Sequence, residues 1–241
     1  MKILEIPQLL LLNLYISYKN AKEFIKVAYR YYSNNVFRKA DLAIVKAYFF
    51  KSAFRIHKQF MKDQNATDIY QYGETYLTAF EMLLNTAGVT PQDVYVELGC
   101  GRGRTCFWAY AFKKCRTIGL DIVPPFIEIA NRIVQKQNLK NIEFVCQDFL
   151  VEKWPEGTVY YIDATLSENH EIAQLIRLFD QLPENTKVIA INMTLTGDYP
   201  SERSQWKKLA SFDTDFPWGI SEANIFVKNK KENKDGKIIA K

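Results

Sequence analysis

The eleven residues VYVELGCGRGR, at Val94–Arg104, constrain the fold of this chain more than any other segment. An apolar, partly β-branched run ends just after Glu97, and such a run predicts a buried strand. Gly99, Gly101 and Gly103 then alternate through a turn. Glycine permits positive φ angles and lets a ligand approach the backbone closely. A strand, a glycine turn and a helix in this order therefore predict an α/β fold with a ligand at the carboxyl end of its sheet.

Downstream of this turn, strand-like runs alternate with helical patterns of about ten to fifteen residues. Such alternation implies right-handed crossovers and a largely parallel, doubly wound sheet. Further strands are predicted at 117–120, 142–146, 159–162, 187–193 and 223–227, and helices at 75–87, 104–113, 125–137 and 171–181. The aromatic stretch 212–218 is expected to be irregular.

The region before residue 65 has a different character. Its apolar residues recur at helical spacing, with a break near residues 33–35, and predict several helices. From Lys2 to Lys62 there are twelve Lys and Arg residues against Glu5, Glu23 and Asp41. A basic, aromatic-rich surface of this kind favours an acidic partner, such as nucleic acid or a nucleoprotein, an anionic membrane surface or an acidic protein. The alternative is a helical cap whose lysines only solvate its outer face.

Acidic residues end three successive predicted strands. Glu97 lies where its charge would repel a pyrophosphate but suits the cationic amino-acid end of S-adenosylmethionine. Asp121 ends the second strand, where a carboxylate accepts hydrogen bonds from both ribose hydroxyls. Asp148, with Phe149 beside it, follows the third strand and suits the amino group and ring of adenine. A nicotinamide-binding loop would have its third glycine at the place of Arg104. The pattern favours an adenosine cofactor without a phosphate chain.

The segment YGETYLTAFEMLLNTAGVTPQDVYVELGCGRGR, from Tyr72 to Arg104, resembles the seven-strand, non-SET histone lysine methyltransferases of the disruptor-of-telomeric-silencing family. The shared features are the Tyr-Gly-Glu-Thr element, the acidic-Leu-Gly-x-Gly-x-Gly turn and the Asp-Phe-Leu element at 148–150. The resemblance covers roughly residues 72–227. It implies a Rossmann-like, seven-strand methyltransferase sheet that binds S-adenosylmethionine and releases S-adenosylhomocysteine.

The resemblance also implies contacts with the cofactor. In that family the Tyr-Gly-Glu-Thr loop closes over the methionine end of the cofactor, which assigns Tyr72 and Thr75 to it. Without the resemblance, Thr75 would be an ordinary helix N-cap. Arg104, at the end of the glycine turn, is also expected to contact the cofactor. The complete set of expected cofactor-binding residues is Tyr72, Thr75, Glu97, Gly99, Gly101, Gly103, Arg104, Asp121, Asp148 and Phe149.

The acceptor side departs from the family's pattern, because Asp163 and Ala164 stand where the family has an Asn-Asn-Phe-type segment. We expect Asp163 to orient the amine of a lysine or to take its proton. Phe149 and Trp218 are expected to wall the channel for that lysine, since an apolar channel favours the neutral amine. Simple core packing is the alternative for Trp218. The sequence thus predicts methylation of a protein lysine. Methylation of RNA or of a small molecule, and a catalytically inactive nucleoside-binding module, stay open as alternatives.

These patterns divide the chain into a basic helical region at 1–68, a methyltransferase domain at 69–228 and a flexible, solvated tail at 229–241. The apolar run at residues 9–16 is too short and too interrupted to span a bilayer, and no cleavage site follows it. An intracellular, soluble (cytoplasmic) protein without a transmembrane segment is therefore expected. Four cysteines without a C-x-x-C pair, and two histidines, predict reduced thiols and no metal site.

Overall fold

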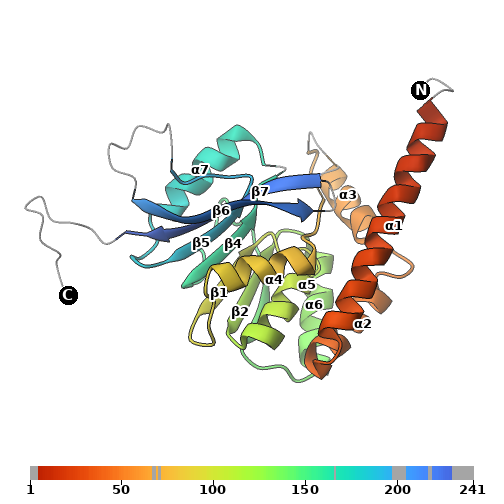
Figure 1. Ribbon diagram of the computed structural model, residues 1–241, viewed down its shortest axis with the longest axis horizontal. Coiled ribbons are helices and arrows are strands. Elements are labelled where there is room, and N and C mark those ends of the chain that lie inside the picture. The colour runs from red at the N-terminus through yellow and green to blue at the C-terminus, as the bar shows by residue number, and fades with distance from the viewer. Residues whose placement is uncertain are drawn as a thin grey trace, which may run out of the picture.

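The computed structural model has a seven-stranded sheet with helices on both faces (Figure 1). It describes residues 5–66, 69, 72–165, 167–196, 205–216 and 219–229, with only the backbone described for 5–16. The helices are α1 (Glu5–Tyr31), α2 (Asn35–Ala47), α3 (Ala53–Asp63), α4 (Leu77–Thr86), α5 (Arg104–Trp108) with the π-helical η1 (Ala109–Lys113), α6 (Pro124–Lys136) and α7 (Asn169–Phe179). The strands are β1 (Val94–Leu98), β2 (Arg116–Asp121), β3 (Ile142–Cys146), β4 (Val159–Asp163), β5 (Lys187–Ile191), β6 (Trp206–Phe216) and β7 (Gly219–Lys228).

The strand order is β3-β2-β1-β4-β5-β7-β6. The pairs from β3 to β5 are parallel, and β7 is antiparallel to both β5 and β6. Apolar clusters cover both faces, one with the N-terminal helices, α4, α5 and α6, the other with α7. The predicted Rossmann-like, seven-strand sheet is confirmed.

One strand was not predicted. Residues 212–216 were expected to be irregular, yet they belong to β6, which pairs with β7 along its whole length. Because β6 is an edge strand, its residues alternate between exposed and half-buried positions and carry little of the apolar signal of a central strand. Trp218 lies outside the described residues, as does the expected flexible tail from residue 230 onward.

The end of β7 also differs from expectation. The strand was predicted to end at residue 227, but it continues to Lys228, which is only 5% exposed. Its ammonium donates hydrogen bonds to the backbone carbonyls of Asp180 and Leu182 at the end of α7. A buried lysine is tolerated here because these carbonyls satisfy its N–H groups.

The N-terminal helices share a core with the sheet. The predicted break near 33–35 is confirmed: Asn34 caps α2 with its side-chain oxygen, and its amide donates to the carbonyl of Ala111 in η1. Phe37 and Ile44 of α2 are buried in the same apolar cluster as Phe126 of α6. Helix α2 therefore packs over α5 and α6.

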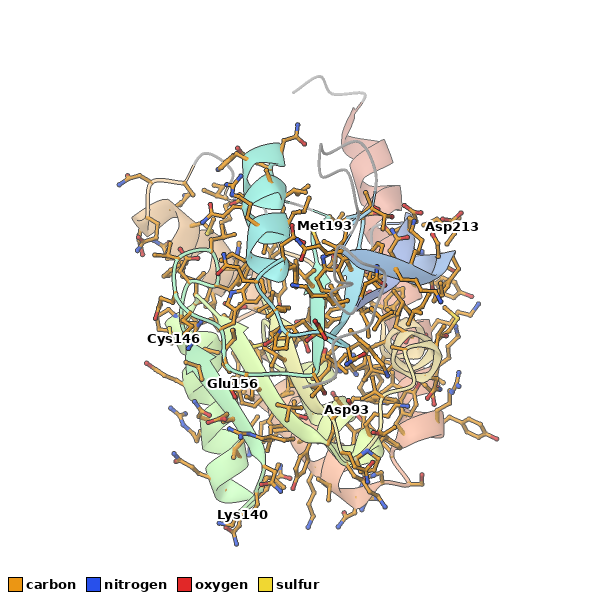
Figure 2. The ribbon with its side chains drawn as sticks, turned by 90° about the vertical axis from the view of Figure 1, so that its left-hand side faces the viewer. Asp93, Lys140, Cys146, Glu156, Met193 and Asp213 are labelled. Atoms are coloured by element: carbon orange, nitrogen blue, oxygen red, sulfur yellow. The ribbon has the colours of Figure 1, made fainter. Side chains whose placement is uncertain are left out.

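The sheet has two outer edges, at β3 and β6. In Figure 2, Cys146 at the end of β3 and Asp213 on β6 lie on opposite sides of the molecule. Cys100, Cys106 and Cys115 are buried as expected, whereas Cys146 is exposed rather than in the core. Among the described residues, no helix is sufficiently long and apolar to cross a membrane, and no cluster of His, Cys, Asp or Glu side chains suits a metal ion.

A buried ion pair joins α2 to the start of α5. Asp41 is fully buried, and its carboxylate accepts hydrogen bonds from Arg104 Nε at 2.6 Å and from Arg104 Nη2 at 3.1 Å. The Tyr32 hydroxyl donates to the same carboxylate at 2.8 Å. A bidentate arginine with a further donor satisfies most of the acceptor capacity of a buried carboxylate. This pair therefore fixes α2 against the glycine turn.

Asp41→Ala is expected to lower the free energy of unfolding by about 3 kcal/mol or more, because it leaves the Arg104 cation without its buried partner. Urea denaturation followed by circular dichroism measures the change. Arg116→Ala is the matched control, since it breaks the ion pair between Arg116 and Glu143. The side chains of these two residues are 57% and 51% exposed, respectively. That change should cost less than about 1 kcal/mol. Equal losses in both variants would contradict a special role for the Asp41 pair.

Candidate functional site

A cavity of about 440 Å³ lies at the carboxyl ends of β1 to β4, within the usual size range of small-molecule sites. Its walls come from the glycine turn, the residues that follow β2, β3 and β4, the loop at Tyr72, and α3. The sequence-predicted residues that line it are Tyr72, Gly99, Gly101, Asp121, Asp148, Phe149 and Asp163. A larger hollow of about 890 Å³ lies beside the amino ends of the strands, where open α/β sheets do not bind their ligands.

The backbone of the glycine turn explains its sequence. Gly99, Gly101 and Gly103 have φ angles of +79°, +53° and +75°, in the left-handed region that other residues rarely adopt. Gly99 and Gly101 line the cavity. Gly103 does not: a Cβ atom there would lie 2.4 Å from the ring of Phe144. Gly103 thus permits close packing of α5 on β3 and has no direct place at the cavity wall.

Asp121 links the end of β2 to the glycine turn. Its carboxylate accepts hydrogen bonds from the backbone N–H groups of Gly101 at 2.7 Å and Val123 at 2.9 Å. Burial raises the pKa of Asp121 to about 6, against these two hydrogen bonds. Each carboxylate oxygen has a second lone pair, so Asp121 can still accept hydrogen bonds from the hydroxyl groups of a ligand in the cavity.

Glu97 does not line the cavity, in contrast to its neighbours in the turn. Its side chain lies beneath the turn and accepts hydrogen bonds from the Tyr95 hydroxyl at 2.9 Å, the Thr105 hydroxyl at 2.6 Å and the Cys106 thiol at 3.1 Å. Burial raises the pKa of Glu97 to about 7, although the three donors oppose the shift. Glu97 therefore stabilises the glycine turn from beneath and does not form part of the cavity wall.

Two other residues that were expected to contact the cofactor, Arg104 and Thr75, do not line the cavity. Arg104 is occupied by Asp41 and is absent from the cavity wall. The Thr75 hydroxyl shares a hydrogen bond of 2.5 Å with the hydroxyl of Tyr161 on β4. Thr75 is not the N-cap of α4 either, because that position is taken by Tyr76. Thr75 therefore holds the loop before α4 against the sheet and does not line the cavity.

An ion pair that sequence reasoning missed holds this loop over the glycine turn. The Arg102 guanidinium donates two hydrogen bonds to the Glu74 carboxylate, and the Tyr72 hydroxyl donates a third. Burial by itself would raise the pKa of Glu74, but the Arg102 charge holds it below the ordinary value. Arg102 also lies over the ring of Tyr48, 5.2 Å from its centroid. In the sequence, the signal for this ion pair was the position of Arg102 between Gly101 and Gly103.

The rest of the cavity wall combines an acid at the end of β4 with side chains from the loop after β3 and from α3. Asp163, at the end of β4, accepts hydrogen bonds from the backbone N–H of Thr165 at 3.1 Å and its hydroxyl at 2.6 Å, and burial raises its pKa. Phe149 lies beside Gly99, where a Cβ atom would be 3.7 Å from its ring. His57 and Met61, one turn apart on α3, complete the wall. No motif marks His57 or Met61, so neither could be expected at this site from sequence patterns.

Comparisons with known proteins agree with this geometry. Residues 90–159 match a protein family described as a methyltransferase domain. No curated protein matches the chain. An RNA methyltransferase from Salinibacter ruber in complex with S-adenosyl-L-homocysteine superposes with a TM-score of 0.51 and 21% identity, over 68% of this chain and 99% of the other. TrmN from Thermus thermophilus gives 0.51 and 14%, over 62% and 48%.

A variant of MtNAS in complex with S-adenosylmethionine gives a TM-score of 0.51 and 13% identity, over 82% of this chain and 73% of the other. At such identities the structures share the fold. The family match covers β1, the glycine turn, β2 and β3, which supply much of the cavity wall. The chain thus has a Rossmann-like methyltransferase fold, and its residues 90–159 are similar to a methyltransferase domain.

The raised pKa of Glu97 has a consequence for stability. Below about pH 4.5 the carboxyl is protonated in the folded and the unfolded chain alike, and between pH 4.5 and about 7 only the unfolded chain releases the proton. Stability is therefore expected to fall across this window as the pH rises, by at most about 3 kcal/mol from this group. Glu97→Gln should flatten that part of the profile in urea titrations at a series of pH values.

Glu143→Gln, at an exposed position on β3, is the control and should leave the profile of the wild-type protein unchanged. A Glu97→Gln profile with the slope of the wild type would show that Glu97 does not titrate in this window.

Proposed function

We propose that this protein transfers the methyl group of S-adenosylmethionine to the amine of a lysine in a protein substrate and releases S-adenosylhomocysteine. The observation that carries the proposal is the meeting of the glycine turn, Asp121 and Asp148 around one cavity at the carboxyl ends of β1, β2 and β3. The glycine turn offers backbone without side chains, and the ends of two neighbouring strands offer carboxylates. This combination suits an adenosine group that carries no phosphates.

The residues present fit that cofactor. Asp121 keeps free acceptor capacity for the two ribose hydroxyls, and the half-buried Asp148 and Phe149 offer an acceptor and a ring for adenine. Tyr72 is held by Glu74 above Gly101, where it covers the turn. When bound, the cofactor supplies a methyl group that its sulfonium centre already activates. The protein then has to position the acceptor nucleophile in line with it.

A lysine acceptor must first lose a proton, which costs roughly 4 kcal/mol at neutral pH from a reference pKa near 10.4. The rings of Tyr72, Phe126 and Phe149 line the cavity and disfavour the charged ammonium. Only Oδ1 of Asp163 accepts a hydrogen bond from Thr165, which leaves Oδ2 to orient the amine or take its proton. The raised pKa of Asp163 makes it a better proton acceptor than an ordinary aspartate.

The basic N-terminal helices have a second part in this proposal. They supply His57 and Met61 to the cavity wall, and we assign to their outer surface the binding of an acidic partner. Attraction of this kind weakens as salt screens the charges.

Asp121→Asn is expected to weaken the binding of S-adenosylmethionine by about ten- to hundredfold, because charge-assisted hydrogen bonds to the ribose become neutral ones. Isothermal titration calorimetry measures the affinity, with NAD as the competing ligand class. Asp213→Asn is the control, since Asp213 is exposed on β6 at the edge of the molecule (Figure 2). Heat of binding with NAD, but none with S-adenosylmethionine or S-adenosylhomocysteine, would contradict the cofactor assignment.

Asp163→Asn is expected to lower turnover by about a hundredfold with little change in cofactor affinity, because it removes a proton acceptor near the amine. The assay transfers a radiolabelled methyl group into total cell extract, with mass spectrometry of the labelled product. Methyl-lysine in a protein supports the proposal, whereas label confined to RNA or a small molecule rejects the lysine acceptor. Cofactor binding without any transfer would indicate a nucleoside-binding module.

A further inference from the structure

The N-terminal helices carry most of the exposed apolar side chains. Of the fifteen large hydrophobic side chains that are exposed among the described residues, ten lie between Tyr18 and Phe54. Phe50 is 92% exposed and Tyr29 91%. Single exposed apolar residues are ordinary on protein surfaces, but a concentration of them marks a surface that contacts another apolar phase.

In α1, the exposed apolar residues Tyr18, Ile25 and Tyr29 lie on the side that faces away from the domain. Glu23 and Tyr31 are buried and belong to the stripe that packs against the protein. Tyr18, Ile25 and Tyr29 are exposed, and at about 100° per residue they fall together on the opposite side of the helix. Figure 1 shows α1 as the outermost helix on its side of the molecule, with its N-terminal half extending away from the sheet.

A second apolar stripe follows on α2. Leu42 and Val45 of α2, three positions apart, are exposed and share one side of the helix axis. Phe49, in the turn after the helix, is exposed as well. Phe50 comes next, and its ring packs edge-on against that of Phe49 with centroids 4.9 Å apart. The two phenylalanines form the apolar tip of the turn between α2 and α3.

The charges around these stripes have one sign. Residues 17–62 contain eleven Lys and Arg side chains and two carboxylates, Glu23 and Asp41. Both carboxylates are buried, where Glu23 accepts hydrogen bonds from Thr78 and Asp41 from Arg104. The outer surface of this region is therefore positively charged, although Lys26 and Arg30 also lie near Glu23 and Glu81.

We infer that this surface docks onto an anionic lipid membrane, with its aromatic and aliphatic side chains in the interfacial layer and its lysines and arginines on the headgroup phosphates. Apolar stripes flanked by basic residues are the pattern of helices that lie in the membrane interface. Nucleic acid matches the charge but leaves Ile25, Leu42 and Phe50 without an apolar environment. A second copy of the chain would place two positive surfaces together. The inference names the acidic partner of the proposed function.

Docking of this kind would bring the cavity close to the bilayer. The turn with Phe49 and Phe50 leads directly into α3, whose His57 and Met61 line the cavity. Phe50 lies three residues before Ala53, the first residue of α3, and His57 follows about 6 Å further along that helix. An acceptor presented at the membrane surface would therefore lie near the opening of the cavity.

The test uses the full chain and co-sedimentation with vesicles of phosphatidylcholine, with or without about 30% phosphatidylglycerol. The protein should sediment with the anionic vesicles only, and less so when the salt is raised from about 0.1 M to about 0.5 M. Phe49→Ser with Phe50→Ser should lower the partition coefficient by about tenfold, because two interfacial rings are lost. Val151→Ser with Ile220→Ser is the control at exposed apolar positions outside the N-terminal helices, and should bind as the wild type does.

Circular dichroism and S-adenosylmethionine calorimetry of each variant show that the fold is intact. Absence of binding to anionic vesicles, or equal binding by the Phe49/Phe50 double variant, overturns the inference. Binding to duplex DNA or RNA without binding to vesicles would assign the surface to nucleic acid and also overturns it. Vesicle binding by a protein that takes up no cofactor would leave the inference standing and reject the methyltransferase proposal.

Discussion

The glycine turn after β1 is held in place by its own two arginines, and the architecture of the site depends on them. Arg102 and Arg104 flank Gly103 and reach in different directions, the first to Glu74 in the loop before α4 and the second to Asp41 in α2. Neither pair is a surface contact, so each has to offset the cost of removing charges from water by good geometry. The geometry is good because both arginines form bidentate hydrogen bonds with their carboxylates. A tyrosine hydroxyl adds a further donor in each pair, from Tyr72 to Glu74 and from Tyr32 to Asp41. The turn thereby fixes the loop that covers the cavity and the helical layer behind it.

This arrangement makes the N-terminal helices part of the site. Division of the sequence at residue 68 follows the change in composition, but the core does not divide there, since Phe37 and Ile44 pack with residues of α5 and α6. α3 supplies His57 and Met61 to the cavity, and Tyr48, at the end of α2, receives Arg102 on its ring. A chain that lost these helices would expose the apolar face of α5 and α6 and leave the cavity open on one side.

Much of the fold could be predicted because its signals are local. Central strands such as β1 and β5 are short apolar runs, and the glycines report a backbone conformation that the structure shows as positive φ. The edge strand β6 escaped because half of its residues face solvent. Arg104 was misplaced because its partner lies 63 positions earlier in the sequence, on a helix whose position no local pattern reveals. For Glu97 a signal existed: it shares a face of β1 with the buried Tyr95, and that face packs on α5 rather than on the cavity.

The burial of acidic groups connects the fold to the chemistry. Glu97, Asp121 and Asp163 all have raised pKa values, because the sheet's carboxyl edge removes them from water and provides few compensating charges. Around the cavity the nearest arginines, Arg102 and Arg104, are already paired with Glu74 and Asp41. The unbound site therefore holds carboxylates whose ionisation costs free energy, and a ligand that brings positive charge offsets that cost. A sulfonium cofactor brings such charge, whereas a phosphate-bearing nucleotide would add to the repulsion. The buried carboxylates lower the stability of the protein at neutral pH, and for the same reason they favour a cationic ligand in the cavity.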